Sequence, residues 1–178
     1  AVTVAYSYIG PKLTYPIYYD GTIGQAKRHL TKTAEKINEK YSDIKAYISV
    51  NKALVTQASA AIPIVPLYFA ILYKVMKVQG THEGCIEQIS RLFHEKLFVE
   101  KPVTDEQGRI RMDDWELSDE VQDKVMECWK NVTTENVAEL SDIDGYWQDF
   151  YQMFGFHLDG VDYAKDVDLE VAIPSLEK

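Results

Sequence analysis

The chain has 178 residues, of which 46% are hydrophobic and 26% are charged, and its formal net charge is −9. This length and composition are typical of one globular domain with its own core. The acidic balance excludes binding to nucleic acid through a general surplus of Lys and Arg. Two cysteines, Cys85 and Cys128, lie far apart in sequence, and we interpret them as buried free thiols in a reducing compartment.

The first part of the chain alternates strand and helix patterns. Alternating apolar residues predict a strand over 1–9, and proline and glycine then predict a loop over 11–21. Apolar residues at three- and four-residue steps predict a helix over 22–40, and a second strand follows over 45–50. Strand, helix and strand in this order indicate an α/β fold with a parallel sheet.

The rest of the chain is predicted to be mostly helical. After a loop over 51–59, the expected helices run past Pro63 and Pro66 to Gln79, over 83–98, from Ser118 through Val132, and near 134–140 and 144–154. The tail from Leu158 onward is acidic and poor in core residues, so we interpret it as a surface segment.

Residues 99–116 contain proline, glycine and six acids, and we interpret them as a solvated surface loop with Trp115 buried beneath it. The acids beside Trp115 also allow a carboxylate pair, which we consider the weaker interpretation. The side chains concerned, with the arginines expected to pair with them, are Asp113, Asp114, Glu116, Arg109 and Arg111.

The longest apolar-rich stretch, residues 58–78, does not have the pattern of a membrane span, because two prolines and two lysines interrupt it. It fits a buried core helix or one wall of an acyl pocket, and the residues alone favour the core. Residues 1–10 lack the basic start and long apolar core of a signal peptide. We therefore expect a cytoplasmic protein, or a mitochondrial one in a eukaryote.

Two Tyr-x8-Lys pairs occur, Tyr18 with Lys27 and Tyr68 with Lys77. With 12 tyrosines and 15 lysines in 178 residues, about one such match is expected by chance, so context must separate them. The second pair lies within one predicted helix, on opposite faces. Tyr18 instead precedes a turn and Lys27 follows it, so these two side chains can converge on one point.

A tyrosine that donates a proton and a lysine that binds a ribose hydroxyl are the two side chains that a short-chain-type reductase needs. No glycine-rich phosphate loop occurs in the sequence. We therefore interpret the chain as the catalytic half of a nicotinamide enzyme whose cofactor-binding half lies elsewhere. Because the chain opens directly in a strand pattern, we expect a fragment or one chain of a nicked protein.

A metal site at His82, Cys85 and His94 is not favoured. Cys85 and His94 lie nine residues apart on one predicted helix and therefore face opposite ways. His82 with Glu83 is better interpreted as the start of that helix, where an acid is favourable.

Several longer motifs carry a more specific signal because they occur in a fixed order over nearly the whole chain. They are Ala5–Pro11, Tyr18–Lys27 enclosing Gly21-Thr22-Ile23-Gly24, Ser49–Ser59, Ile62–Tyr68, His82–Gln88, Arg109–Glu116, Phe154–Phe156 and Asp159–Tyr163. Together they resemble the C-terminal part of the trans-2-enoyl-CoA reductase family, which includes the FabV-type enoyl-ACP reductases.

The resemblance implies a Rossmann-like α/β fold related to short-chain reductases, with several added helices. Residues 1–178 would be the C-terminal catalytic and substrate-binding part, and an N-terminal half would bind the dinucleotide. The implied activity is NADH-dependent reduction of the trans-2 double bond of an enoyl-CoA or enoyl-ACP, in fatty acid synthesis or acyl-CoA reduction. The implied partners are this substrate and the N-terminal half of the same enzyme, without which the chain should bind NADH poorly.

The resemblance also implies roles for individual residues. Tyr18 would be the active-site tyrosine, and Lys27 would bind the cofactor ribose and lower the pKa of Tyr18 through its charge. Tyr8 would be a second tyrosine that assists at the thioester carbonyl. The remaining positions are Leu54, Val55 and Thr56 beside the nicotinamide, and Val65, Tyr73 and Tyr146 along the acyl crevice; the family often has phenylalanine at the position of Tyr73.

Two other functions fit the residues. A non-catalytic α/β or mostly helical interaction module would keep the same core without needing Tyr18. A carbonyl reductase of the short-chain group would share the tyrosine and lysine chemistry. The sequence does not show whether the acyl carrier is CoA or acyl carrier protein, how long the acyl chain is, or whether the cofactor is NADH or NADPH.

Overall fold

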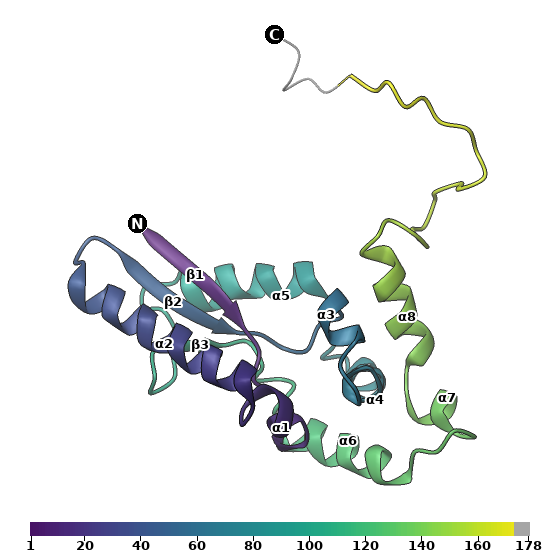
Figure 1. Cartoon of the computed structure of the whole chain (residues 1–178), viewed down its shortest axis with the longest axis horizontal. Helices are drawn as coiled ribbons and strands as arrows, with labels where there is room; N and C mark the ends of the chain where they lie inside the picture. Colours follow the sequence, from purple (N-terminus) through teal and green to yellow (C-terminus); the bar gives the residue numbers. More distant parts are fainter. Residues whose placement is uncertain (173–178) are drawn as a thin grey trace.

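A computed structural model describes residues 1–172 and places three parallel strands in one sheet (Figure 1). The strands are β1 (Val2–Ser7), β2 (Lys45–Val50) and β3 (Arg109–Arg111), in the order β1-β2-β3. Val2 lies opposite Lys45, and the outer edge of β1 pairs with no other strand within residues 1–172. The parallel α/β sheet predicted from the sequence is confirmed.

The helices connect the strands and extend beyond them. They are a short 3-10 turn (Lys12–Thr14), α1 (Tyr15–Tyr18), α2 (Thr22–Lys40), α3 (Gln57–Ala60), α4 (Val65–Gln79), α5 (Cys85–Arg91), a π-helical continuation of α5 (Leu92–Leu97), α6 (Asp119–Asn131), α7 (Val137–Leu140) and α8 (Ile143–Gln152). The predicted helix over 22–40 is confirmed at both ends. None of the helices described is both long and apolar enough to cross a bilayer.

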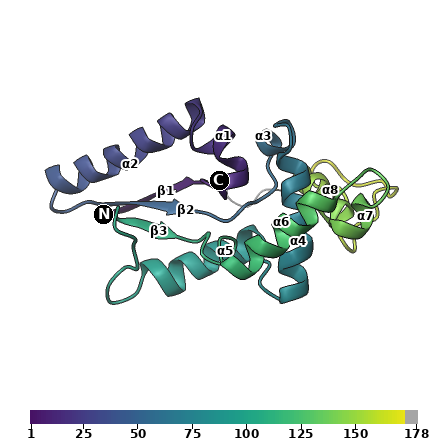
Figure 2. The same ribbon diagram turned by 90° about the horizontal axis from the view of Figure 1, so that it is seen from below.

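Figure 2 shows the layers: α2 covers one face of the sheet and α5 lies on the other. The carboxyl ends of the strands point toward a group of helices formed by α3, α4, α6 and α8. In parallel α/β sheets this end is where ligands bind. Helix α4 is the centre of the group, because α6 and α8 both pack against it.

Helix α4 is apolar on nearly all sides and buried on nearly all sides, as a central helix must be. This confirms the core interpretation for the part of residues 58–78 that lies in α4, whereas only Ser59 is buried among residues 58–64. The helix begins at Val65, later than expected, because Ile64 has a left-handed backbone (φ 65°). Pro66 then fits the first turn, where a missing N–H leaves no hydrogen bond unmade.

The predicted surface loop over 99–116 is wrong in its second half. That part contains β3, and the neighbouring side chains of Ile110, Met112 and Glu116 are all fully buried. Trp115, expected beneath the loop, is 39% exposed. The physical reason is visible in the sequence, because Ile110 and Met112 alternate with arginines in the two-residue period of a strand.

Arg91, at the end of α5, holds the segment after β3 in place. Its guanidinium makes two parallel bonds to the Glu83 carboxylate, at 2.7 and 2.8 Å, and both side chains are buried. It also donates to Asp114 and to the Met112 carbonyl, and it lies 4.0 Å from the Trp115 ring centre. Glu83 therefore belongs to a buried ion pair and not to the helix start, which lies at Cys85 after Gly84.

Three smaller expectations have mixed outcomes. Both cysteines are free thiols as predicted, but Cys85 is exposed and Cys128 only partly buried. The expected loop over 11–21 contains the 3-10 turn and α1. The tail is exposed from Leu158 through residue 172, as expected, and residues 173–178 lie outside the described chain.

Candidate functional site

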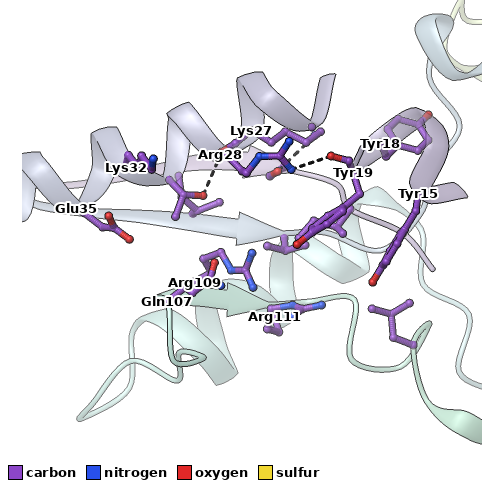
Figure 3. A pocket seen from close by; sticks show the side chains of 18 residues that line it. Tyr15, Tyr18, Tyr19, Lys27, Arg28, Lys32, Glu35, Gln107, Arg109 and Arg111 are labelled. Carbon is purple, nitrogen blue, oxygen red and sulfur yellow. Dashed lines mark hydrogen bonds between the residues drawn. The ribbon is translucent and has the colours of Figure 1, made fainter. Parts of the chain in front are cut away.

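A cavity of about 400 Å³ lies between α2 and the sheet (Figure 3). Tyr18 and Lys27 both line it, together with Ser7 and Gly10 from the end of β1. Four further cations border it, Arg28 and Lys32 from α2 and Arg109 and Arg111 from β3; both β3 arginines are paired with aspartates.

The turn between Tyr18 and Lys27 depends on glycine. Tyr18 ends α1, Gly21 caps α2, and Lys27 lies in the second turn of α2. A side chain at Gly24 would collide with the backbone carbonyl of Tyr19. The Arg28 guanidinium also donates to this carbonyl, at 2.8 Å. The close approach of α2 to Tyr19 therefore sets the position of Tyr18 relative to Lys27.

Gly24→Ala is expected to lower the melting temperature by several degrees, because the new methyl group must push α2 away from Tyr19 by moving backbone, at about 1–3 kcal/mol. Scanning calorimetry measures the melting temperature of both proteins. Ala26→Ser on the same helix, at an exposed position, is the matched control. A melting temperature equal to that of the control would contradict the packing described for Gly24.

Tyr18 is 8% exposed, and its ring meets the Tyr8 ring edge-on, with centres 4.9 Å apart. Burial, with a smaller effect of Tyr146, raises the pKa of Tyr18. Lys27 was expected to lower this pKa through its charge, and in this structure burial outweighs any such effect. Burial also lowers the pKa of Lys27, whose ammonium donates to the Ser7 hydroxyl at 3.4 Å.

Within residues 1–172 no hydrogen bond joins Tyr18 to Lys27. Figure 3 shows Lys27 reaching along α2 toward the turn that carries Tyr18, while the hydroxyl end of Tyr18 points away from Lys27. The two side chains thus border one cavity, and the tyrosine hydroxyl faces the apolar helices beyond it.

Those apolar helices bring together most of the remaining predicted site residues. One buried cluster contains Tyr18, Val55, Val65, Tyr73 and Tyr146, with Tyr8 packed against it. The Val55 N–H donates to the Tyr73 hydroxyl at 3.2 Å. The Tyr146 hydroxyl is buried and has no hydrogen bond of acceptable geometry among residues 1–172, although it lies near Ser59.

Leu54 and Thr56 lie at the border of this cluster. Leu54 is partly buried, and Thr56 is exposed and caps α3 through a reciprocal pair of bonds with Ser59. The loop over 51–56 therefore connects the carboxyl end of β2 to the helical group. This loop is where the structure places all three residues expected beside a nicotinamide.

Sequence reasoning placed Glu116 in a solvated loop, or less favourably in a carboxylate pair, but the structure buries it fully beside the loop over 51–56. One carboxylate oxygen accepts bonds from the Tyr8 hydroxyl at 2.9 Å and the Tyr68 hydroxyl at 2.7 Å. The other oxygen accepts the Ala53 N–H at 2.7 Å. Burial raises the pKa of Glu116, and these three donors oppose that rise only in part.

Lys52, to which sequence reasoning gave no role, is 1% exposed. Its ammonium donates to the Ala53 carbonyl at 2.9 Å and lies 4.7 Å from the Tyr73 ring centre. Burial lowers the pKa of Lys52 to about 8. Lys52 is the only charged residue between Lys45 and Lys74, and this isolation is the signal that could have identified it.

Lys52 predicts an unusual pH dependence of stability. Its pKa is about 8 when folded and 10.5 when free, so between these values the unfolded chain binds more protons. The protein should therefore become more stable relative to Lys52→Met as the pH rises from 8 to 10.5, by about 3 kcal/mol. Urea unfolding of both proteins across this range measures the difference, and parallel curves would contradict the buried ammonium.

The three residues considered for a metal do not form a site. His82 packs edge-on against Tyr73, Cys85 is exposed at the start of α5, and His94 contacts Ser90. Within residues 1–172 no group of three or more His, Cys, Asp or Glu side chains is arranged to hold a metal ion.

A family model described as "Trans-2-enoyl-CoA reductase catalytic region" matches residues 1–98, which is more than half of the chain. The chain belongs to the trans-2-enoyl-CoA reductase family. A second model, described as "Enoyl reductase FAD binding domain", matches residues 104–167. The resemblance drawn from the ordered motifs is confirmed.

Relatives in this family align with nearly the whole chain. An enoyl-acyl-carrier-protein reductase (NADH) of Cytophaga hutchinsonii is 56% identical over 99% of this chain and 45% of the relative. A trans-2-enoyl-CoA reductase (NADH) of Clostridium perfringens is 59% identical over 94% of this chain and 43% of the relative. The chain thus spans less than half the length of these relatives.

Solved structures of family members have the same fold. The Clostridium acetobutulicum trans-2-enoyl-CoA reductase in complex with NADH has a TM-score of 0.90 and is 56% identical, over 94% of this chain and 43% of that one. The Treponema denticola enzyme in complex with NAD also gives 0.90, at 50% identity, over 93% of this chain and 42% of that one.

The flavin in the description of the second model can be tested against the structure. A dinucleotide's phosphates need helix N-termini of positive potential. In residues 104–167 the first turns of α6, α7 and α8 instead carry acids: Asp119, Glu120, Glu139 and Asp144. These three helix N-termini therefore do not offer a positive potential to the pyrophosphate of a flavin dinucleotide.

Proposed function

We propose that the protein containing this chain reduces the trans-2 double bond of an enoyl thioester with NADH. The observation that carries the proposal is the position of Tyr18, buried against Tyr8 at the carboxyl ends of the strands and bordering the cavity that Lys27 lines. The names of relatives that are more than half identical, with NADH or NAD bound in two solved structures, support it.

Bound NADH would supply a hydride to the β-carbon of the substrate, and negative charge would then develop on the thioester oxygen. The Tyr18 hydroxyl would donate a hydrogen bond to this oxygen, a contribution of about 3 kcal/mol in comparable sites. Because its pKa is raised, Tyr18 stays protonated at neutral pH and remains a donor. A proton then adds at the α-carbon, which gives the saturated thioester and NAD⁺.

The other residues would bind and orient. Lys27 would hold a ribose hydroxyl of the cofactor, and the loop Leu54–Thr56 would lie beside the nicotinamide. Val65, Tyr73 and Tyr146 would line the acyl chain, with the unpartnered Tyr146 hydroxyl available to the substrate. The family resemblance assigns Tyr8 to the thioester oxygen as well, but in the structure its single O–H donates to Glu116.

We propose that an N-terminal portion, absent from this chain, supplies the dinucleotide-binding half. The sheet would then be one end of a larger Rossmann-like sheet of the short-chain reductase type, with β1 continuing into it. The length of the relatives supports this, as does the unpaired outer edge of β1. The cytoplasmic location inferred from the sequence remains a prediction.

The test is NADH oxidation by the natural polypeptide that contains this chain, with crotonyl-CoA as substrate. Turnover with crotonyl-CoA and none with a saturated ketone is the expected result. Activity on the ketone alone would favour a carbonyl reductase instead, and no oxidation with either substrate would favour an interaction module. Repeating the assay with crotonyl-acyl carrier protein and with NADPH defines the carrier and the cofactor.

A further inference from the structure

The Tyr8 hydroxyl is already engaged. A phenol has a single O–H, and that of Tyr8 donates to Glu116 at 2.9 Å. Tyr8 therefore has no second proton to offer a substrate oxygen while Glu116 is a carboxylate. The Tyr18 hydroxyl, in contrast, makes no hydrogen bond within residues 1–172 and is available as a donor.

We propose that Glu116 is a positioning residue for the reductase reaction: it holds Tyr8 as an orienting ring against Tyr18 and fixes the peptide that leads into Leu54–Thr56. This inference rests on the proposed function and gives the two tyrosines different roles. Tyr18 is the hydrogen-bond donor to substrate, and Tyr8 sets where that donor lies.

The first contact of Glu116 fixes the position of the Tyr8 ring against Tyr18. Tyr8 packs edge-on against Tyr18 and against Phe69, with ring centres 4.9 and 6.0 Å apart. Edge-to-face packing fixes the distance between rings but leaves each ring free to slide. The bond from Tyr8 to Glu116 removes that freedom, because the carboxylate is itself fixed by Tyr68 on α4.

The second contact of Glu116 holds the backbone of the loop that follows β2. The Ala53 peptide is held at both polar groups, since its N–H donates to Glu116 and its C=O accepts from Lys52. Neighbouring N–H groups also donate to buried side chains, that of Lys52 to the Gln88 amide oxygen and that of Val55 to the Tyr73 hydroxyl. A loop with its backbone bonded in this way cannot shift without breaking several buried hydrogen bonds.

The chemistry of the site requires a carboxylate. Three donors converge on the two oxygens of Glu116, from Tyr8, Tyr68 and Ala53. An amide in the same place would either turn its NH₂ to the Ala53 N–H, which loses that bond, or turn it to the two tyrosine hydroxyls, which would then have to accept where they now donate. Lys52 is the cation that faces this carboxylate, and burial of both makes their attraction stronger than at a surface.

The test measures the kinetics of Glu116→Gln, with the exposed Glu127→Gln on α6 as the matched control. The expected result is a fall in kcat of about tenfold, through misplacement of Tyr18, together with a higher KM for NADH from the loosened loop. The control should match the wild type in both constants.

A double-mutant cycle with Tyr8→Phe separates positioning from a general loss of stability. If Glu116 acts on kcat through Tyr8, then Glu116→Gln should change kcat less than about twofold in the Tyr8→Phe background. The rise in KM for NADH should persist there, because the Ala53 contact is independent of Tyr8. Multiplicative losses of kcat in the double variant, or a Glu116→Gln enzyme equal to the control, would overturn the inference.

The same assays distinguish failure of this inference from failure of the proposed function, which would appear as a wild type without enoyl-thioester reduction. If Glu116→Gln does not fold, Tyr68→Phe replaces it, because the Tyr68 hydroxyl donates to the same Glu116 oxygen as the Tyr8 hydroxyl. A loss of kcat of about threefold that disappears in the Tyr8→Phe background is then expected. An unchanged kcat would overturn the inference.

Discussion

Tyr18→Phe is expected to lower kcat for enoyl-thioester reduction by about 100- to 1,000-fold, the usual effect of removing one donor to a developing oxyanion. The melting temperature should stay within about two degrees of the wild type, because the hydroxyl has no hydrogen bond to lose within residues 1–172. Steady-state kinetics and thermal unfolding measured by circular dichroism provide the two readings.

Tyr41→Phe, at the exposed end of α2, is the matched control and should leave both readings unchanged. A Tyr18→Phe enzyme with near-normal kcat would contradict the assignment of Tyr18 as the donor. A similar loss of activity with a large fall in melting temperature would instead indicate that the ring acts through packing alone.

Arg91→Met is expected to lower the free energy of unfolding by about 3–5 kcal/mol, because it leaves the Glu83 carboxylate buried without its cation. The substitution also removes the bond to the Met112 carbonyl, and with it the support of the segment that carries Glu116. Urea denaturation of both proteins at neutral pH measures the difference.

The double variant Glu83→Leu with Arg91→Met is the control for this prediction. Removing both charges should restore part of the lost stability, since an apolar pair of similar volume avoids the desolvation of two ions. A single variant that loses less than about 1 kcal/mol would contradict the buried pair, because that is the range of exposed ion pairs.

The elements that the sequence predicted correctly are those with a regular spacing of apolar residues. Helix α2 was predicted from its apolar spacing and the glycine before it, and the structure begins and ends it at the expected residues. β3 was missed because it has only three residues and lies among acids. Acidic residues in a sequence predict exposure to solvent. In the fold both acids are buried, because Asp113 pairs with an arginine and Glu116 accepts a hydrogen bond from a tyrosine.

The site also has a part that the sequence could predict, which is local in sequence, and a part that it could not. Convergence of Tyr18 and Lys27 on one cavity could be predicted because the turn between them lies within ten residues. The direction of the Tyr18 pKa could not, because it depends on burial by α4 and α8, which are distant in sequence. Glu116 is 63 residues from Ala53 and 108 from Tyr8, so no spacing rule could connect it to them.

The outer edge of β1 has a consequence for how this chain behaves without the rest of its protein. Val2 and Tyr6 are both about half exposed there, beside a row of backbone groups that no strand within residues 1–172 pairs with. Such an edge is a template for strand addition and favours self-association during purification. If the proposed N-terminal portion completes the sheet at this edge, the two portions must fold together. A destabilising substitution far outside this chain would then loosen Tyr8 and the site after β1.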